Sequence, residues 1–212
     1  LGYPRFEGTP RTKKALAKLY KTVSPDDIIL VHGGTGANNT VVFSLLEPEK
    51  DNIISIMPNY QQFHSIPRSI GVEVRDVHLK AERGYKLDLL ELAAAVDENT
   101  KAIMFTNPNN PTGSLLLPEE MEELIKIAKS VDAWIVCDEM YRGLADEYMP
   151  SFADMYDKAI VTCSSSKIYS MAGTRVGWIV CKDEAMRQNI FNHRSYDAIC
   201  GGVFDEWIFA IA

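Results

Sequence analysis

A lysine that follows a run of three serines is the strongest candidate for covalent chemistry. Ser164-Ser165-Ser166-Lys167 comes directly after the apolar run Ala159–Cys163, and Arg175 stands eight residues beyond the lysine, flanked by glycines. A serine-rich loop with one lysine is usually solvated surface. Hydroxyl groups and a guanidinium, however, bind phosphate, and an amine beside them can form a Schiff base with an aldehyde. We therefore expect a ligand that carries both groups.

An acidic residue closes a second apolar run. Asp138-Glu139-Met140-Tyr141 follows Trp134–Cys137. Asp138 could simply cap the following turn, or it could face a cleft and pair with a pyridinium nitrogen. Tyr141 is close enough in sequence to reach the same ligand. This segment alone leaves the two interpretations open.

Asparagine and tyrosine follow two other apolar runs. The segment Asn107–Gly113, Asn-Pro-Asn-Asn-Pro-Thr-Gly, reads as two successive turns, since Asn-Pro and Pro-x-Gly favour turns. Its paired prolines make the loop stiff, which favours a fixed Asn110 whose amide faces a ligand oxygen. Tyr60, in Pro58-Asn59-Tyr60, could stack on a ligand ring, although a tyrosine in this position more often packs against the protein.

A glycine-rich segment could bind an anion. Gly33–Asn38, Gly-Gly-Thr-Gly-Ala-Asn, is predicted to form a turn between a strand over Ile28–His32 and a helix that includes Val41–Leu46. Free backbone N–H groups and the helix dipole attract phosphate at such turns. The segment lacks the Lys-Ser/Thr of a P-loop and the spacing of a dinucleotide-binding fingerprint. It indicates an anion site and no particular ligand.

Strands and helices alternate along the sequence and position these groups. Thr9-Pro10, Asp88 and Pro118 are predicted to begin helices, and the last of these helices buries the stripe Met121, Leu124, Ile125 and Ala128. The pattern predicts one α/β domain, a three-layer sandwich with a mostly parallel seven-stranded sheet and helices on both faces. Functional residues should lie at the carboxyl ends of the strands. The predicted strands are Ile28–His32, Ile53–Met57, Glu73–Leu79, Ala102–Thr106, Trp134–Cys137, Ala159–Cys163 and Val176–Cys181.

Composition narrows the function classes. The net charge is −7 and no long Lys/Arg run is present, which argues against a nucleic-acid or anionic-membrane partner. No apolar run reaches the roughly 18 residues of a membrane span, and no signal peptide begins the sequence. The four cysteines, Cys137, Cys163, Cys181 and Cys200, form no C-x-x-C pair, and the four histidines are scattered. We expect a cytoplasmic protein without disulfides or a metal site.

The motifs together resemble one family. N-P-x-N-P-T-G, D-E-x-Y and S-x-S-K followed by G-x-R-x-G occur in the order and approximate spacing of the class I/II aminotransferases, within fold-type I of the pyridoxal-5′-phosphate (PLP) enzymes. The resemblance covers essentially all 212 residues. It implies PLP as cofactor, an L-amino acid and a 2-oxo acid as substrates between which an amino group moves, and a homodimer.

The resemblance also implies a role for each site residue. Lys167 would form the Schiff base and shuttle the proton, and Asp138 would keep the pyridine nitrogen protonated. Tyr141 and Asn110 would hydrogen-bond the phenolic oxygen, while Tyr60 would stack on the ring. Tyr3 would reach the phosphate of the neighbouring subunit. The phosphate in this chain would be held by Gly34, Thr35, Ser164, Ser166 and Arg175.

Two parts of the family pattern have no counterpart. These are the segment before Tyr3 and the C-terminal small domain, which supplies the arginine for the substrate carboxylate. We therefore expect residues 1–212 to be the PLP-binding large domain of a truncated chain, with apolar surface exposed on Val203–Ala212. Neither Arg142 nor Arg194 is a candidate for the missing arginine.

Two alternative functions remain open at this point. The same cofactor chemistry could serve a β-lyase of the cystathionine or alliin type, or a cyclase similar to capreomycidine synthase. From another class, the chain could be a non-catalytic PLP-binding domain of a regulator. No basic helix-turn-helix is present in the sequence to support that alternative.

Overall fold

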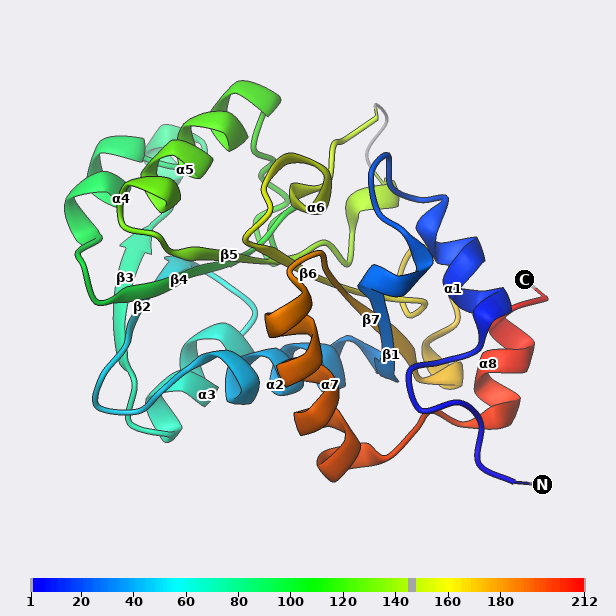
Figure 1. The fold of residues 1–212 in the computed structure, drawn as a ribbon. Coiled ribbons are helices and arrows are strands. Elements are labelled where there is room, and N and C mark those ends of the chain that lie inside the picture. Colours follow the sequence, from blue (N-terminus) through cyan, green and yellow to red (C-terminus); the bar gives the residue numbers. More distant parts are fainter. Residues whose placement is uncertain (1, 145–147, 212) are drawn as a thin grey trace.

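Short helices and strands alternate along the chain in the computed structural model, which describes residues 2–144 and 148–211 (Figure 1). The strands are β1 (Ile28–His32), β2 (Asn52–Met57), β3 (Glu73–His78), β4 (Thr100–Thr106), β5 (Trp134–Asp138), β6 (Ala159–Ser164) and β7 (Val176–Cys181). The α-helices are α1 (Pro10–Ala17), α2 (Gly33–Leu45), α3 (Gln62–Ser69), α4 (Leu89–Ala95), α5 (Pro118–Ser130), α6 (Phe152–Met155), α7 (Glu184–Ala198) and α8 (Val203–Phe209). Short 3-10 helices are η1 (Pro25–Asp27), η2 (Ala81–Arg83), η3 (Arg142–Leu144) and η4 (Ala172–Thr174).

The strands form one seven-stranded sheet in the order β1-β7-β6-β5-β4-β2-β3. β7 runs antiparallel to both of its neighbours, and the other neighbouring pairs are parallel. The predicted mostly parallel sheet is confirmed, and each predicted strand forms with bounds that differ by at most two residues at either end.

Helices cover both faces of the sheet, which confirms the predicted three layers. α2, α3 and α7 lie on one face, and α1, α4, α5 and α6 lie on the other (Figure 1). Each face has its own apolar core. Residues of one strand alternate between these cores: Ile103 and Phe105 of β4 belong to one, and Met104 belongs to the other.

Local sequence explains where several helices begin. The Asp88 carboxylate accepts hydrogen bonds from the N–H groups of Leu90 and Glu91 and caps α4, as predicted. Pro118 opens α5, whose predicted apolar stripe is buried. Thr9 is the N-cap residue of α1 and Pro10 follows as the first helical residue, as predicted, although the Thr9 side chain forms no capping hydrogen bond. Its hydroxyl instead contacts the Thr12 hydroxyl, while its backbone N–H donates to Glu206 Oε2 at 3.0 Å.

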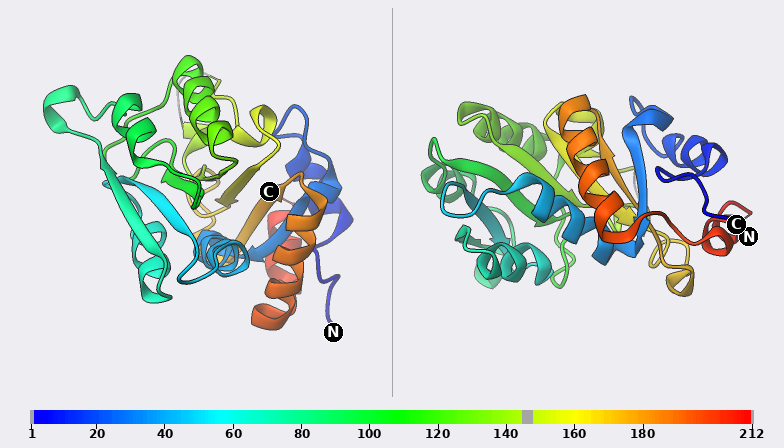
Figure 2. Two further views of the ribbon diagram at one scale, coloured as in Figure 1. Left: turned by 60° about the vertical axis from the view of Figure 1, so that its left-hand side comes forward. Right: turned by 60° about the horizontal axis from the view of Figure 1, so that its bottom comes forward.

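The contact of Thr9 with Glu206 places the N-terminal segment beside α8 at the β1 side of the sheet (Figure 2). α8 packs against β7 through Phe209, which contacts the Trp178 ring. Its other face carries the exposed side chains Phe204, Trp207 and Ile208, and Ile211 follows in the same state. The predicted apolar surface is therefore present over the described part of Val203–Ala212.

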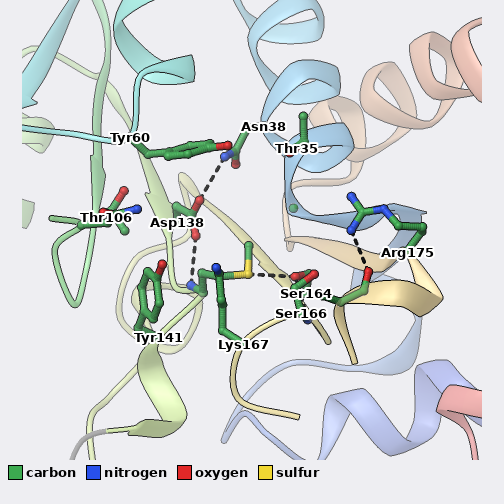
Figure 3. A pocket seen from close by; sticks show the side chains of 14 residues that line it. Thr35, Asn38, Tyr60, Thr106, Asp138, Tyr141, Ser164, Ser166, Lys167 and Arg175 are labelled. Carbon is green, nitrogen blue, oxygen red and sulfur yellow. Dashed lines mark hydrogen bonds between the residues drawn. The ribbon is translucent and has the colours of Figure 1, made fainter. Parts of the chain in front are cut away.

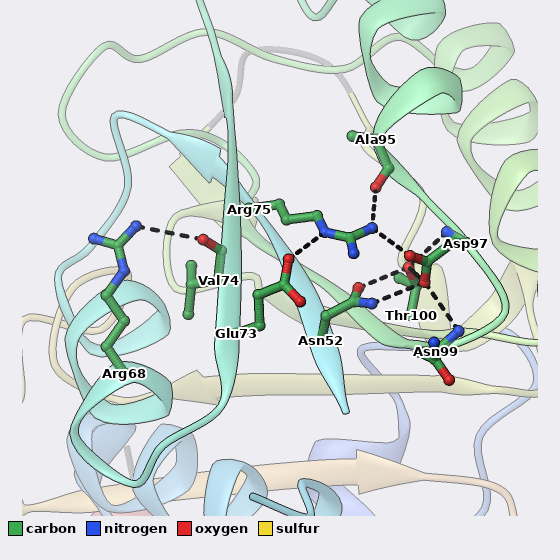
Figure 4. A network of polar contacts seen from close by, with 9 residues as sticks. All are labelled: Asn52, Arg68, Glu73, Val74, Arg75, Ala95, Asp97, Asn99 and Thr100. Atoms are coloured by element: carbon green, nitrogen blue, oxygen red, sulfur yellow. Dashed lines mark hydrogen bonds and ion pairs between the residues drawn. The ribbon is translucent and has the colours of Figure 1, made fainter. Parts of the chain in front are cut away.

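Polar residues join the amino ends of β2, β3 and β4 (Figure 4). Asp97 accepts from Asn52 Nδ2 at 2.8 Å and pairs with Arg75 Nη1 at 2.7 Å, and Arg75 Nε also contacts Glu73. The hydrogen bond from Asn52, followed by that from Arg75, lowers the pKa of Asp97 from 3.8 to about 2. This network aligns the three strands at the edge opposite their carboxyl ends.

Among the described residues, no helix combines the length and the hydropathy needed to cross a membrane, and no group of three or more His, Cys, Asp or Glu side chains is suited to hold a metal ion. All four cysteines are free and buried.

We predict that Asp97→Asn flattens the acid dependence of stability. The folded chain keeps Asp97 ionised down to a pH of about 2, so its stabilisation is complete above pH 4 and is lost as the pH falls towards 2. Urea unfolding between pH 5 and 2.5 should show the variant losing less stability than the native chain. Asp157→Asn, at an exposed carboxylate paired with Lys182, serves as control and should follow the native curve. Parallel curves for the native chain and Asp97→Asn would contradict the prediction.

Candidate active site

Five strands end at one cleft of about 250 Å³ at the carboxyl edge of the sheet. β1, β2, β4, β5 and β6 run parallel, so the segments that follow them meet there. β7 is antiparallel, so it is its amino end that lies at this edge, and Arg175 precedes that strand. The cleft is lined by Gly34, Thr35, Asn38, Tyr60, Thr106, Asn110, Asp138, Met140, Tyr141, Ser164, Ser166, Lys167, Ala172 and Arg175.

The cleft contains every site residue predicted from the sequence except Tyr3. Tyr3 is 77% exposed near the N-terminus and lies outside the cleft. Sequence reasoning did not single out Asn38, Thr106, Met140 or Ala172. Of these, Asn38 could have been found from its position one helical turn after Gly34 and Thr35.

One end of the cleft is suited to an anion. α2 begins directly at Gly33, so the predicted loop over Gly33–Asn38 is wrong: these residues form the first turns of the helix, whose unpaired N–H groups lie at this end. Gly33 has a φ of +66°, and a Cβ there would overlap the Arg175 guanidinium. A Cβ at Gly177 would overlap the Gly33 backbone. Glycine at both positions lets helix, strand and guanidinium approach one another closely.

Hydroxyl groups and a guanidinium complete this anion-binding end (Figure 3). The Ser164 hydroxyl accepts from the Ser166 N–H at 3.1 Å, and Arg175 donates through Nη1 to the Ala172 carbonyl at 2.9 Å. Arg175 has a φ of +50°. This backbone conformation costs free energy for residues other than glycine and is often found at functional sites. Ser165 is buried, and its hydroxyl donates to the Met171 and Val176 carbonyls, which anchors the loop.

Lys167 lies between the anion-binding end and the Asp138 end of the cleft (Figure 3). Its side chain is exposed and forms no hydrogen bond or ion pair with the described residues. An amine placed in this way is accessible to a ligand and contributes little to the core.

A buried carboxylate marks the opposite end. Asp138 is 3% exposed; its Oδ1 accepts from the Met140 N–H at 2.9 Å and its Oδ2 accepts from Asn38 Nδ2 at 3.0 Å. Burial raises the pKa of Asp138 from 3.8 to about 6, although the bonds from Asn38 and Met140 oppose this shift. Asp138 thus caps the turn and also lines the cleft, while its pairing with a pyridinium nitrogen stays a prediction. No described cation pairs with it.

A network of amide groups fixes the loops that carry Tyr60 and Asn110. Asn59 accepts from the Thr106 hydroxyl at 2.9 Å and donates to the Met104 carbonyl. Asn109 donates to the Pro58 carbonyl at 2.9 Å, and its own oxygen accepts from Thr112. The loops after β2 and β4 are therefore held to one another, which supports the prediction of a rigid Asn110.

Neither Arg142 nor Arg194 is available in the cleft. Arg142 pairs with the buried Glu139 at 2.9 Å and stacks over the Tyr20 ring. Arg194 is 1% exposed and donates to the Ile199 carbonyl. Neither side chain lines the cleft.

Known proteins share both this sequence pattern and this fold. The family profile "Aminotransferase class I and II" matches residues 1–196. Nicotianamine aminotransferase 1 of Oryza sativa subsp. japonica is 32% identical over 85% of this chain and 38% of its own length. Histidinol-phosphate aminotransferase of Bacteroides thetaiotaomicron is 35% identical over 77% of this chain and 46% of its own length. The chain therefore spans less than half the length of these curated relatives.

Solved structures agree. A PLP-dependent aminotransferase from Streptococcus suis superposes with a TM-score of 0.96 and 40% identity, over 100% of this chain and 56% of that one. Aspartate aminotransferase from Thermus thermophilus shares the fold, with a TM-score of 0.92, at 24% identity over 99% of this chain and 56% of its own. With the profile match, these similarities identify the chain as a member of the class I and II aminotransferase family, whose cofactor is PLP.

Proposed function

We propose that the intact protein is a PLP-dependent aminotransferase that moves an amino group between an L-amino acid and a 2-oxo acid. The observation that carries this proposal is a single cleft with an anion-binding end, a lysine and a buried carboxylate, neither of which pairs with a charged side chain in the part of the chain that the structure describes. A cofactor with a phosphate, an aldehyde and a basic ring nitrogen complements that set. PLP has these three groups, so the residues of the cleft fit it.

Each end of the cleft would hold one part of the cofactor. The first turn of α2 with Gly34 and Thr35, together with Ser164, Ser166 and Arg175, would bind the phosphate. Asp138 would keep the ring nitrogen protonated, and Tyr141 and Asn110 would donate to the phenolic oxygen. Tyr60 would cover the ring. When bound, PLP supplies an acceptor for the electron pair that remains when the substrate loses its Cα proton.

The chain's own residues would orient the reaction and move the proton. Lys167 Nζ would hold the cofactor covalently in the resting state. Once the substrate amine displaces it, Lys167 would take the Cα proton as a general base and would later donate it as a general acid. The Asp138 charge would stabilise the reaction electrostatically through the ring nitrogen. Tyr60 and the stiff Asn110 loop would keep the ring from shifting.

The rest of the protein's organisation is also a proposal. Residues 1–212 would form the PLP-binding large domain, with the arginine for the substrate carboxylate outside it, which the partial coverage of the relatives supports. A homodimer in which Tyr3 reaches the partner's phosphate is supported by the exposure of Tyr3. Four unpaired buried cysteines support a cytoplasmic location.

We expect Lys167→Ala to abolish covalent attachment of PLP with little effect on folding, because the Lys167 side chain is exposed and contacts no polar partner among the described residues. Native protein mixed with PLP should show a visible absorption band that borohydride removes, leaving the label on the peptide that contains Lys167. Lys86→Ala, at another exposed lysine, should behave like the native protein. Equal uptake of reducible cofactor by Lys167→Ala would refute the assignment.

Asp138→Asn should stabilise the cofactor-free chain while it lowers turnover of the intact enzyme by several orders of magnitude. The folded native chain keeps the Asp138 proton up to a pH of about 6, whereas the unfolded chain loses it near 3.8. Stability therefore falls as the pH rises through this interval, and the variant avoids that loss, by up to about 3 kcal/mol above pH 6.

Denaturant unfolding of both forms from pH 4 to 8 measures this difference. Glu139, whose pKa burial raises to about 7, titrates in both forms, so its contribution largely cancels. A difference in unfolding free energy that does not grow between pH 4 and 6, or a near-native turnover of Asp138→Asn, would show that Asp138 only caps its turn.

The 212-residue chain alone should bind PLP weakly and should not transaminate common amino acids. Bidentate capture of the substrate carboxylate by arginine supplies affinity and also places Cα near Lys167, so its loss reduces both binding and rate. The test is a coupled keto-acid assay on the chain beside a polypeptide of full family length that contains it. Comparable activity would place the carboxylate site within this chain and would refute the prediction.

A further inference from the structure

Asn38 is the residue of the cleft that contacts the buried carboxylate through its side chain. It lies on α2, one turn beyond Gly34 and Thr35, and is 1% exposed. Its Nδ2 donates to Asp138 Oδ2 at 3.0 Å, as Figure 3 shows. The helix that presents N–H groups to the anion-binding end therefore also contacts the opposite end of the cleft.

Thr162 fixes the orientation of this amide. Its hydroxyl, on β6 and fully buried, donates to Asn38 Oδ1 at 2.6 Å. An ionised carboxylate can only accept hydrogen bonds, so Asn38 must turn its NH₂ group to Asp138 and its oxygen to Thr162. Gln62, at 3.3 Å from the same Nδ2, is a weaker second partner. The two hydrogen bonds therefore run in one direction: the Thr162 hydroxyl donates to Asn38, and the Asn38 NH₂ group donates to Asp138.

No charged side chain pairs with Asp138 among the described residues, so the Asn38 amide is its main side-chain hydrogen-bond donor. On β5 and its turn, the Glu139 carboxylate is engaged by Arg142, and burial raises the pKa of the Cys137 thiol. On β6, burial likewise raises the pKa of Cys163. None of the titratable groups on the loops around the cleft forms an ion pair or a hydrogen bond with Asp138 among the described residues; they are Tyr60, Tyr141, Lys167 and Arg175.

We propose that Asn38, oriented by Thr162, is a positioning residue that fixes the Asp138 carboxylate towards the cleft and keeps it ionised for the ring nitrogen of the cofactor. The second half of this inference rests on the proposed function. The first half concerns the chain alone and can be measured without turnover. A hydrogen bond to a charged group stabilises the charged form, so its loss should raise the proton affinity of Asp138 by about tenfold or more.

The test is the titration of Asp138 in the cofactor-free chain, followed by NMR of carboxyl-labelled aspartate, with Asp138→Asn to assign the signal. In Asn38→Leu, which keeps the size but removes the donor, the pKa should rise by about one unit or more above its native value of about 6. Asn38→Asp replaces the donor with a like charge and should raise it further. Thr162→Val should produce a smaller rise, because the amide stays but loses its orientation.

Thr40→Val is the matched control, at a buried position of the same helix without a hydrogen bond to Asp138. It should leave the titration unchanged. The affinity of each variant for PLP, measured by equilibrium titration at pH 7.5, should fall about tenfold in Asn38→Leu and should be native in Thr40→Val.

An unchanged Asp138 pKa in both Asn38 variants, or an equal shift in Thr40→Val, would overturn the proposal. A shifted pKa with native PLP affinity would overturn its second half. If Asn38→Leu fails to fold by circular dichroism, Thr162→Val, which preserves shape, decides the same question. A lack of transamination by the native intact protein would refute the proposed function and would leave the titration result standing.

Discussion

The parallel alignment of the strands is the constraint on which the site depends. A strand delivers its following residue to one edge of the sheet, and because β1, β2, β4, β5 and β6 share a direction, five separate segments converge on a single cleft. The network around Arg75 and Asp97 supports this alignment from the other edge, where it joins the starts of β2, β3 and β4. The cleft thus depends on contacts that lie a full strand length away from it.

Asp138 has opposite effects on the stability of the chain and on the proposed function. Its burial disfavours the charged form, and among the described residues the donors that offset this are the Asn38 amide and the Met140 N–H. A group that is unfavourable for folding in its ionised form and yet lies at a cleft indicates a ligand that compensates its charge. Lys167 is the counterpart at the centre of the cleft: it is exposed, adds nothing to the core and has no ion pair or hydrogen bond from its side chain within residues 2–144 and 148–211.

Most of the fold and nearly all of the cleft could be predicted from the sequence, because both depend on local patterns. Runs of Ile and Val bounded by turn residues located the seven strands, and polar residues after them located the site. The contact between Asn38 and Asp138 was missed because it spans 100 residues and depends on how α2 crosses β5 and β6. The amide network of Asn59 and Asn109 was missed for the same reason. The start of α2 at Gly33 was missed because it depends on a close approach between helix and strand, which glycine at positions 33 and 177 permits and which local patterns do not show.

The reversed strand has a consequence for how the site assembles. β6 and β7 are adjacent antiparallel strands, so the segment from Ser165 to Arg175 closes a short local loop and needs no helical crossover. Closing a short loop costs less conformational entropy than joining segments that are far apart in the sequence. Lys167 and Arg175 can therefore reach their mutual spacing as soon as this one pair of strands forms. The parallel strands pair across long crossovers, so the remaining groups of the cleft depend on contacts between segments far apart in the sequence.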